Sequence, residues 1–213
     1  MSIRPNSVIA VAAFALLTLI ACKEREKPED SPATTATPDT AAPTQRVVGP
    51  LSPADSQALA TMNDKVKEYI DLHTKLEAGL PEIPKEATPQ QIDKNQRAFE
   101  ALMRKTRATA KQGDIFTPQA QPVIKRLLAS VFAGPEGKQL KASIMDENPA
   151  GITLVVNGRY PDSVPLSTVP PEVLQTLPKL SEDMEYRFIG DRLILLDTHA
   201  HVIADFIEDA LPK

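Results

Sequence analysis

Residues able to bind a metal ion lie close together near the C-terminal end of the chain. Asp197, His199 and His201 occur in the segment DTHAH, and Asp205 follows shortly after it. Imidazole nitrogens and carboxylate oxygens are ligands that zinc and related divalent ions accept. On a single strand, His199 and His201 would project to the same face about 7 Å apart, close enough for both imidazoles to approach one ion.

The same segment also has the position of a turn, because it separates two apolar stretches that we expect to be strands. A tight metal site needs a third and a fourth ligand, and the sequence does not identify them. We therefore predict an exposed turn that contains histidines, with no cofactor. Asp197, His199 and His201 remain the alternative metal ligands.

A third histidine, His73, lies in the apolar stripe of a predicted helix. There it could act as a metal ligand or a proton carrier, but a buried histidine with satisfied ring nitrogens is the commoner arrangement. We expect His73 to belong to the core or its boundary.

Motifs of the common catalytic classes are missing from the sequence. It contains no G-x-S-x-G, H-E-x-x-H or S-x-x-K pattern and no glycine-rich phosphate loop. The acidic pairs Asp146-Glu147 and Glu182-Asp183 flank predicted element ends, where solvation or helix capping explains them. We predict no catalytic residues and expect that the protein is not an enzyme.

The composition excludes several classes of partner. The net charge is −4 and only 4% of the 213 residues are aromatic, with no Trp, so neither a basic patch for nucleic acid nor an extensive stacking platform is expected. A single cysteine, Cys22, rules out an intramolecular disulfide.

The N-terminal segment has the pattern of an export signal. One basic residue, Arg4, precedes the apolar stretch Val8–Ile20. As a helix this stretch would be about 20 Å long, which is shorter than the roughly 30 Å hydrocarbon core of a bilayer. A cleaved leader therefore fits better than a membrane span, with a tilted or interfacial anchor helix as the alternative.

The four residues Leu19-Ile20-Ala21-Cys22 resemble the lipobox of bacterial lipoproteins, and the charged segment KEREK follows them. The resemblance implies that residues 1–21 are removed as a signal peptide and that Cys22 is the lipid attachment site. Two or three acyl chains would anchor the protein to a membrane without spanning it. Lys23 in place of Asp favours the outer membrane, on the periplasmic side of the cell envelope.

Residues 22–51 form a predicted disordered tether. The segment is rich in Pro, Thr and Ala and has few large apolar residues, so it cannot bury enough surface to offset its ordering entropy. Fully extended it would reach about 85 Å, and as a flexible coil about 30 Å.

Residues 52–147 are predicted to be helical. Cap, proline and polar residues start helices at SPAD (52–55), TPQQ (88–91) and TPQAQP (117–122), and Gly79, Gly113 and Gly134 end them. A shorter fourth helix is expected over 137–145.

Periodic apolar residues define the inward faces of these helices. The basic face of the second helix could meet an acidic lipid or polymer, although such faces are usually solvated. The expected inward residues are Leu59, Met62, Val66, Tyr69, His73 and Leu76 in the first helix, and Ile92, Phe99, Leu102, Met103 and Thr106 in the second.

Residues 148–213 are predicted to be rich in strands. A hairpin turn at Gly190-Asp191 separates two β-rich runs, a third run follows DTHAH, and Ile152–Val156 is a possible fourth strand. Pro171 can start a short helical turn. The predicted fold class is α+β: three or four N-terminal helices packed with a C-terminal antiparallel β-meander of three or four strands, as one folded unit.

The C-terminal stretch from NGRYPDSVP to VIADFI resembles a recurrent pattern in uncharacterised exported bacterial proteins, and more remotely small periplasmic domains of the RcnB type. The resemblance implies a fold and an exported location. RcnB-type proteins are linked to nickel and cobalt homeostasis, but no matching metal ligands can be transferred to this chain.

We therefore predict a lipid-anchored cell-envelope protein whose domain is a non-enzymatic binding or structural module. Its expected partners are the membrane, through the covalent lipid, and an envelope protein or polymer. The alternative is a periplasmic metal-binding protein or hydrolase with an unrecognised site.

Overall fold

The computed structural model describes residues 49–147, 151–165 and 169–213. The predicted leader, Cys22 and the tether as far as residue 48 lie outside the described residues. The described residues belong to one compact unit. Among its described residues, no helix is both long and apolar enough to cross a membrane.

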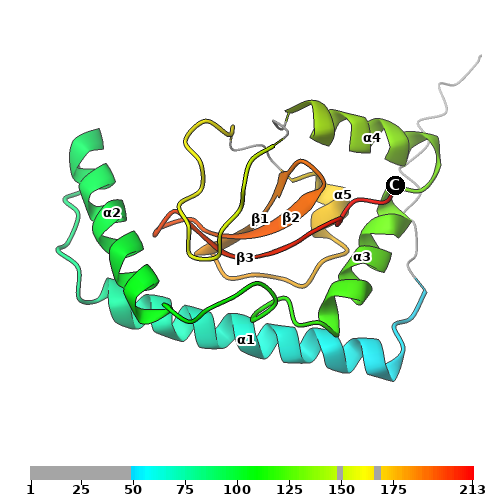
Figure 1. Ribbon diagram of the computed structural model, residues 1–213, viewed down its shortest axis with the longest axis horizontal. Coiled ribbons are helices and arrows are strands. Elements are labelled where there is room, and N and C mark those ends of the chain that lie inside the picture. The colour runs from blue at the N-terminus through cyan, green and yellow to red at the C-terminus, as the bar shows by residue number, and fades with distance from the viewer. Residues whose placement is uncertain (1–48, 148–150, 166–168) are drawn as a thin grey trace, which may run out of the picture. The chain divides into compact units, whose positions relative to one another are not determined.

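The predicted α+β class is confirmed: helices precede a three-stranded antiparallel sheet (Figure 1). The elements are α1 (Pro53–Glu77), α2 (Pro89–Thr106), α3 (Ala120–Val131), α4 (Gly134–Glu147), α5 (Pro171–Leu174), β1 (Met184–Ile189), β2 (Arg192–Asp197) and β3 (Val202–Ile207).

The first two helices begin where their capping residues predict. At the start of α1, the Ser52 side chain accepts a hydrogen bond from the Asp55 amide at 3.1 Å. At the start of α2, Thr88 and Gln91 form a reciprocal capping box, with bonds of 3.3 and 2.8 Å. Each cap satisfies amide groups that have no partner inside the helix. The short helix at Pro171 is also confirmed.

Helix α2 ends earlier than predicted, at Thr106 instead of near Gly113. The following residues wrap around the buried carboxylate of Asp205, which accepts the amide of Gly113, and Gly113 has a φ of +90°. The bond to Asp205 therefore replaces the last turns of the expected helix.

Two predicted inward positions of this helix are also wrong, because Ile92 is 40% exposed and Thr106 is exposed.

The basic face of α2 is partly neutralised along the helix. Arg97 pairs with Asp93 at 2.9 Å and Arg104 with Glu100 at 3.3 Å, each one turn apart. These exposed pairs are typical of a solvated helix surface.

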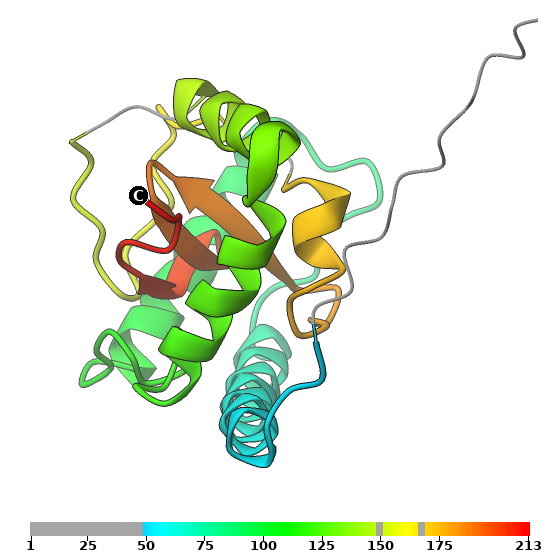
Figure 2. The ribbon, with the colours of Figure 1, turned by 90° about the vertical axis from the view of Figure 1, so that its right-hand side faces the viewer.

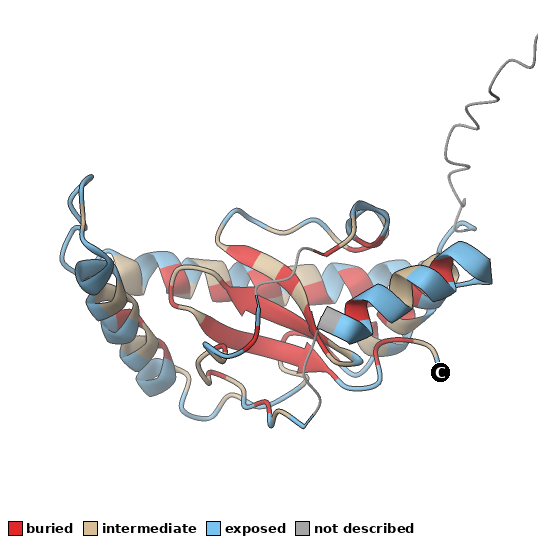
Figure 3. Cartoon of the chain, turned by 90° about the horizontal axis from the view of Figure 1, so that it is seen from above, coloured by how far each residue is buried: buried red, intermediate tan, exposed pale blue. Residues whose placement is uncertain are grey.

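The three strands form the predicted meander in the order β1-β2-β3. Ile189 pairs with Arg192 across the Gly190-Asp191 turn, and Asp197 pairs with both Met184 and Val202. Asp197 therefore ends β2 with a strand on each side. Strands β2 and β3 are almost entirely buried, as the apolar run in the sequence predicts (Figure 3).

The predicted strand at Ile152–Val156 is wrong. The Gly158 amide bonds to the Val155 carbonyl at 2.9 Å, Asn157 adopts a left-handed φ of 61°, and Val155 is 60% exposed. This turn interrupts the β-branched run. The chain bonds to β3 from the turn itself, where the Asn157 amide donates to the Ile203 carbonyl at 2.8 Å, and just after it, where Arg159 forms an isolated bridge with Val202.

The sheet is covered on both faces. One core joins side chains of α1, α2 and α3 to one face of the strands, and a second core places Leu154, Tyr160 and Val164 against the other. Helix α1 contacts α2 and α3, and α3 contacts α5 (Figures 1 and 2). This packing brings the C-terminal end of α1 to the end of β2.

Candidate metal centre

Three side chains of α1 face the end of β2, namely Tyr69, His73 and Glu77. They are four residues apart, so they lie on successive turns of one helix face. Tyr69 and His73 are buried, and the Glu77 side chain is 40% exposed. The helix therefore carries a polar column from the core to the surface.

Asp197 connects this column to the sheet. Its Oδ2 accepts hydrogen bonds from Tyr69 Oη at 2.9 Å and from His73 Nδ1 at 2.7 Å. Its Oδ1 accepts the amides of His199 at 3.1 Å and Ala200 at 2.8 Å. Asp197 is fully buried, and these four donors satisfy both of its oxygens.

The bond to Asp197 determines the tautomer of His73. An ionised carboxylate only accepts hydrogen bonds, so Nδ1 carries the proton and Nε2 can offer its lone pair. Nε2 is buried and has no hydrogen-bond partner among the described residues. Its nearest charged atoms are Glu77 Oε2 at 3.5 Å and Asp183 Oδ1 at 4.0 Å. A buried lone pair thus faces two carboxylates.

The surroundings of His73 favour positive charge. Burial alone would lower the pKa of its imidazole, but the hydrogen bond and charge of Asp197, with the charges of Asp183 and Glu77, raise it above the usual value. A cation next to this ring, whether a proton or a metal ion, is stabilised by the same three carboxylates.

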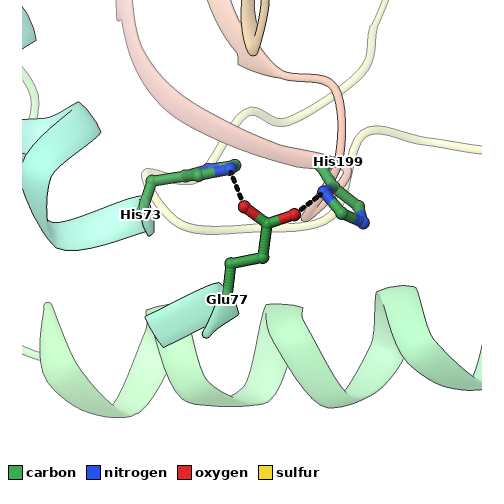
Figure 4. A group of neighbouring side chains, drawn as sticks. All are labelled: His73, Glu77 and His199. Atoms are coloured by element: carbon green, nitrogen blue, oxygen red, sulfur yellow. Dashed lines mark ion pairs between the residues drawn. The ribbon is translucent and has the colours of Figure 1, made fainter. Parts of the chain in front are cut away.

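His199 completes the cluster from the turn between β2 and β3. Its Nδ1 lies 2.8 Å from Glu77 Oε1, so Glu77 lies between the two imidazoles (Figure 4). The His199 side chain is 33% exposed. The buried ring of Phe99 packs edge-on against both, with centroids 4.8 Å from His73 and 5.5 Å from His199.

One ligand atom from each of His73, Glu77 and His199 lies within 4.8 Å of the other two. Two imidazole nitrogens and one carboxylate oxygen form a ligand set that zinc and related divalent ions accept. Asp197 bonds to the far nitrogen of His73, as carboxylates commonly do behind a metal-bound histidine. The arrangement can therefore hold one divalent ion.

The candidate metal ligands predicted from the sequence have different positions and contacts in the structure. His199 joins the cluster, whereas Asp197 supports His73 from behind and has no free oxygen. His201 lies elsewhere: it has a φ of 56°, and its ring packs edge-on against Tyr160 at 5.8 Å. Burial and the charge of Arg159 lower the pKa of its imidazole.

The predicted turn at 198–201 is confirmed, so the alternative with His199 and His201 on one strand is wrong. The turn is partly buried instead of exposed, because Ala200 is 0% exposed and His199 and His201 are intermediate. The two bonds from Asp197 to the turn amides hold it against the core.

Asp205 belongs to a different network. It is fully buried and accepts the amides of Gly113, Ile115 and Phe116, each of the last two at 2.8 Å. Burial raises the pKa of its carboxyl, and these hydrogen bonds partly offset the effect. Its contacts are those of a residue that holds the loop after α2.

His73 is buried as predicted, but its environment contains residues that the sequence interpretation missed. Glu77 lies four positions later on the same helix, and this spacing was a usable signal. Asp183 was interpreted as an acid explained by solvation or helix capping. Asp197 lies 124 positions from His73, a separation that no local pattern spans.

Two surface hollows of about 300 and 370 Å³ lie along α1. Neither is lined by His73, Glu77 or His199. The cluster is therefore not part of either hollow.

Comparisons of the chain with protein-family models, curated proteins and solved structures found no match. The resemblances to lipoproteins and to RcnB-type domains therefore stay predictions.

Proposed function

We propose that the folded domain binds one divalent transition-metal ion through His73, Glu77 and His199. The observation that carries the proposal is the Nε2 atom of His73. It is buried without a hydrogen-bond partner among the described residues, and it faces Glu77 while Asp197 holds the opposite nitrogen at 2.7 Å. An unpaired polar atom in such a position is costly unless something binds it.

The charges around the site support this proposal. Glu77 makes its ion pairs with the two histidines, and Asp197 is bonded to His73 from the core. Bringing these negative groups together is unfavourable unless positive charge balances them. A divalent ion provides that balance.

The exposure of the ligands supports reversible binding. His73 is held rigidly by Asp197, whereas Glu77 and His199 are 40% and 33% exposed. An ion can reach the site from solvent and needs only these two side chains to adjust. We propose a binding module and not an enzyme.

The location of the module is proposed from the leader. The lipobox resemblance at Leu19-Ile20-Ala21-Cys22 supports a lipid on Cys22 that holds the domain at the periplasmic side of the envelope, with the outer membrane favoured by Lys23. The tether would let the domain bind ions at a distance from the lipid surface. An envelope protein or polymer partner remains a prediction from the sequence.

The test is a titration of the purified full-length protein, stripped with EDTA, with Zn²⁺ in a calorimeter. We expect one ion per chain, and a large loss of affinity for Glu77→Gln and His199→Asn. The matched control is His201→Asn, because asparagine also tolerates the left-handed backbone at that position. Binding that is absent in the wild type, or lost equally in the control, would contradict the proposal.

A second measurement links binding to stability. An ion bound only by the folded state at 100 times its dissociation constant adds about 2.7 kcal/mol to the free energy of unfolding. Zn²⁺ should therefore raise the melting temperature of the wild type and of His201→Asn, and EDTA should reverse the shift. Glu77→Gln should show little response.

A further inference from the structure

Resting on the proposed function, we infer that the Asp183 carboxylate is a fourth ligand, so that His73, Glu77, His199 and Asp183 form a closed, four-coordinate zinc site. The proposed function requires only three ligands. The fourth decides whether the ion keeps an open position for water.

The backbone holds Asp183 beside the cluster. Asp183 immediately precedes β1, and its carbonyl accepts hydrogen bonds from the Thr198 amide at 3.0 Å and the Thr198 hydroxyl at 3.2 Å. Thr198 is next to His199 in the same turn. The segment before β1 and the turn after β2 are therefore hydrogen-bonded to each other beside the two ligands Asp183 and His199.

The Asp183 side chain points toward the same imidazole nitrogen as Glu77. Its Oδ1 lies 4.0 Å from His73 Nε2, and its side chain is 42% exposed. Among the described residues, the ion-pair partner of Asp183 is His73 and not a lysine or arginine. By contrast, Glu100 on α2 has Arg104 and Arg159 as partners. Asp183 thus resembles Glu77 in facing histidine without a basic side chain.

The separations between neighbouring groups are close to those that a tetrahedral site requires. Four ligand atoms about 2.1 Å from a tetrahedral zinc ion lie about 3.4 Å from one another. The nearest separations in the structure are 2.8 Å from His199 Nδ1 to Glu77 Oε1, 3.5 Å from Glu77 Oε2 to His73 Nε2, and 4.0 Å from His73 Nε2 to Asp183 Oδ1. Each Glu77 oxygen faces a different imidazole, so on binding an ion Glu77 would turn one oxygen toward it. The partly exposed side chains of Glu77, His199 and Asp183 are free to close on a common point beside the buried His73.

The ligand chemistry selects the class of metal. Two imidazole nitrogens with two carboxylate oxygens suit zinc, whereas calcium and magnesium prefer oxygen alone and Cu(I) prefers sulfur. A closed set of four protein ligands is typical of sites that hold an ion, and catalytic zinc sites keep a position for water. The inferred site would therefore store or sense zinc. It would also link α1 to the residue just before β1 and to the turn just after β2.

The experiment uses Co²⁺ as a spectroscopic probe in the full-length protein. Four-coordinate Co²⁺ absorbs visible light far more intensely than the five- or six-coordinate ion. We expect an intense spectrum for the wild type. For Asp183→Asn we expect one bound ion, a changed spectrum because water takes the fourth position, and an affinity lower by at least tenfold.

The adjacent exposed acid gives a matched control, Glu182→Gln, which should retain the intense spectrum and the affinity of the wild type. Asp183→Asn keeps the carbonyl that accepts from Thr198, and circular dichroism checks its fold. If that variant does not fold, the wild-type protein decides: a weak spectrum, or an intense spectrum that added azide changes by taking an open position, overturns the inference.

The two proposals fail differently. Stoichiometric Co²⁺ binding with identical spectra and affinities in wild type and Asp183→Asn would remove Asp183 from the site and leave the three-ligand function intact. No stoichiometric binding by the wild type would overturn both.

Discussion

The Nδ1 atom of His73 lies 2.7 Å from Oδ2 of Asp197, although the two residues are 124 positions apart and both side chains are fully buried. This contact fastens the last turns of α1 to the end of β2. It also turns the opposite nitrogen of His73 toward Glu77 and Asp183. The fold and the candidate site therefore depend on the same hydrogen bond.

Replacing Asp197 should damage both stability and metal binding. In Asp197→Asn the amide can accept with only one oxygen, so donors among Tyr69, His73 and the turn amides lose their partner. We expect the free energy of unfolding to fall by about 3 kcal/mol in EDTA, measured by urea denaturation. The zinc affinity should fall roughly 10- to 100-fold.

Asp209→Asn is the control for that change. Asp209 is exposed and has a left-handed φ of 47°, which asparagine tolerates. Its stability should stay within about 0.5 kcal/mol of the wild type. If Asp197→Asn were as stable as this control, the Asp197 network would not hold α1 to the sheet.

The second buried carboxylate should affect stability alone. Asp205 accepts amides from Gly113, Ile115 and Phe116, and the asparagine amide in Asp205→Asn would place donors against donors. We expect a loss of about 2–4 kcal/mol in urea denaturation and faster hydrogen exchange at these amides. Zinc affinity, measured where the variant is folded, should match the wild type. An equal loss of affinity would show that the two networks are coupled.

The ion pair between α1 and α3 should give an acid-dependent contribution to stability. Hydrogen bonds from Arg126 and Ser52 lower the pKa of Asp55 below 3.8. A carboxyl with a lowered folded-state pKa stabilises the fold above its unfolded pKa, and this contribution is lost as the pH falls through the folded value. Arg126→Gln should therefore be less stable than the wild type at neutral pH.

The difference between wild type and Arg126→Gln should shrink as the pH falls below about 3.8, the ordinary Asp value. Urea denaturation at several pH values measures it. The exposed pair between Lys67 and Asp64 serves as a control, because Lys67→Gln should change stability little at any of these pH values. A pH-independent difference for Arg126→Gln would rule out the charge of Asp55 as its cause.

The lipid anchor can be tested separately from the metal. Cys22→Ser removes the thiol that the lipobox resemblance assigns to acylation. We expect loss of acyl labelling and of cleavage before residue 22, so that the leader is retained, with the zinc affinity of the domain unchanged. Unchanged processing and acyl labelling would contradict the lipoprotein prediction.

Local signals explain which parts of the fold could be predicted. The caps at Ser52 and Thr88 and the turn at Gly190-Asp191 act over a few residues, so their sequences determine where elements begin. The β-branched run Ile152–Val156 failed as a predictor because Asn157 turns the chain there. The prediction for the end of α2 is wrong because Asp205, which accepts the amides of the residues after the helix, lies far along the chain.

The candidate site could be predicted only in part. The spacing of His73 and Glu77 is visible in the sequence, and His199 was already a candidate ligand. Their meeting depends on how α1 packs across the sheet, which the apolar stripe indicates only in general terms. The supporting role of Asp197 follows from four hydrogen bonds that local patterns do not encode.

The most direct test of the metal site observes the three histidines of the chain individually. Long-range ¹H–¹⁵N NMR spectra of the EDTA-stripped protein, recorded before and after one equivalent of Zn²⁺, report on each ring nitrogen. The account predicts that Zn²⁺ shifts Nε2 of His73 and Nδ1 of His199 and leaves His201 unchanged. Unshifted resonances of His73 and His199 in the presence of Zn²⁺ would contradict it.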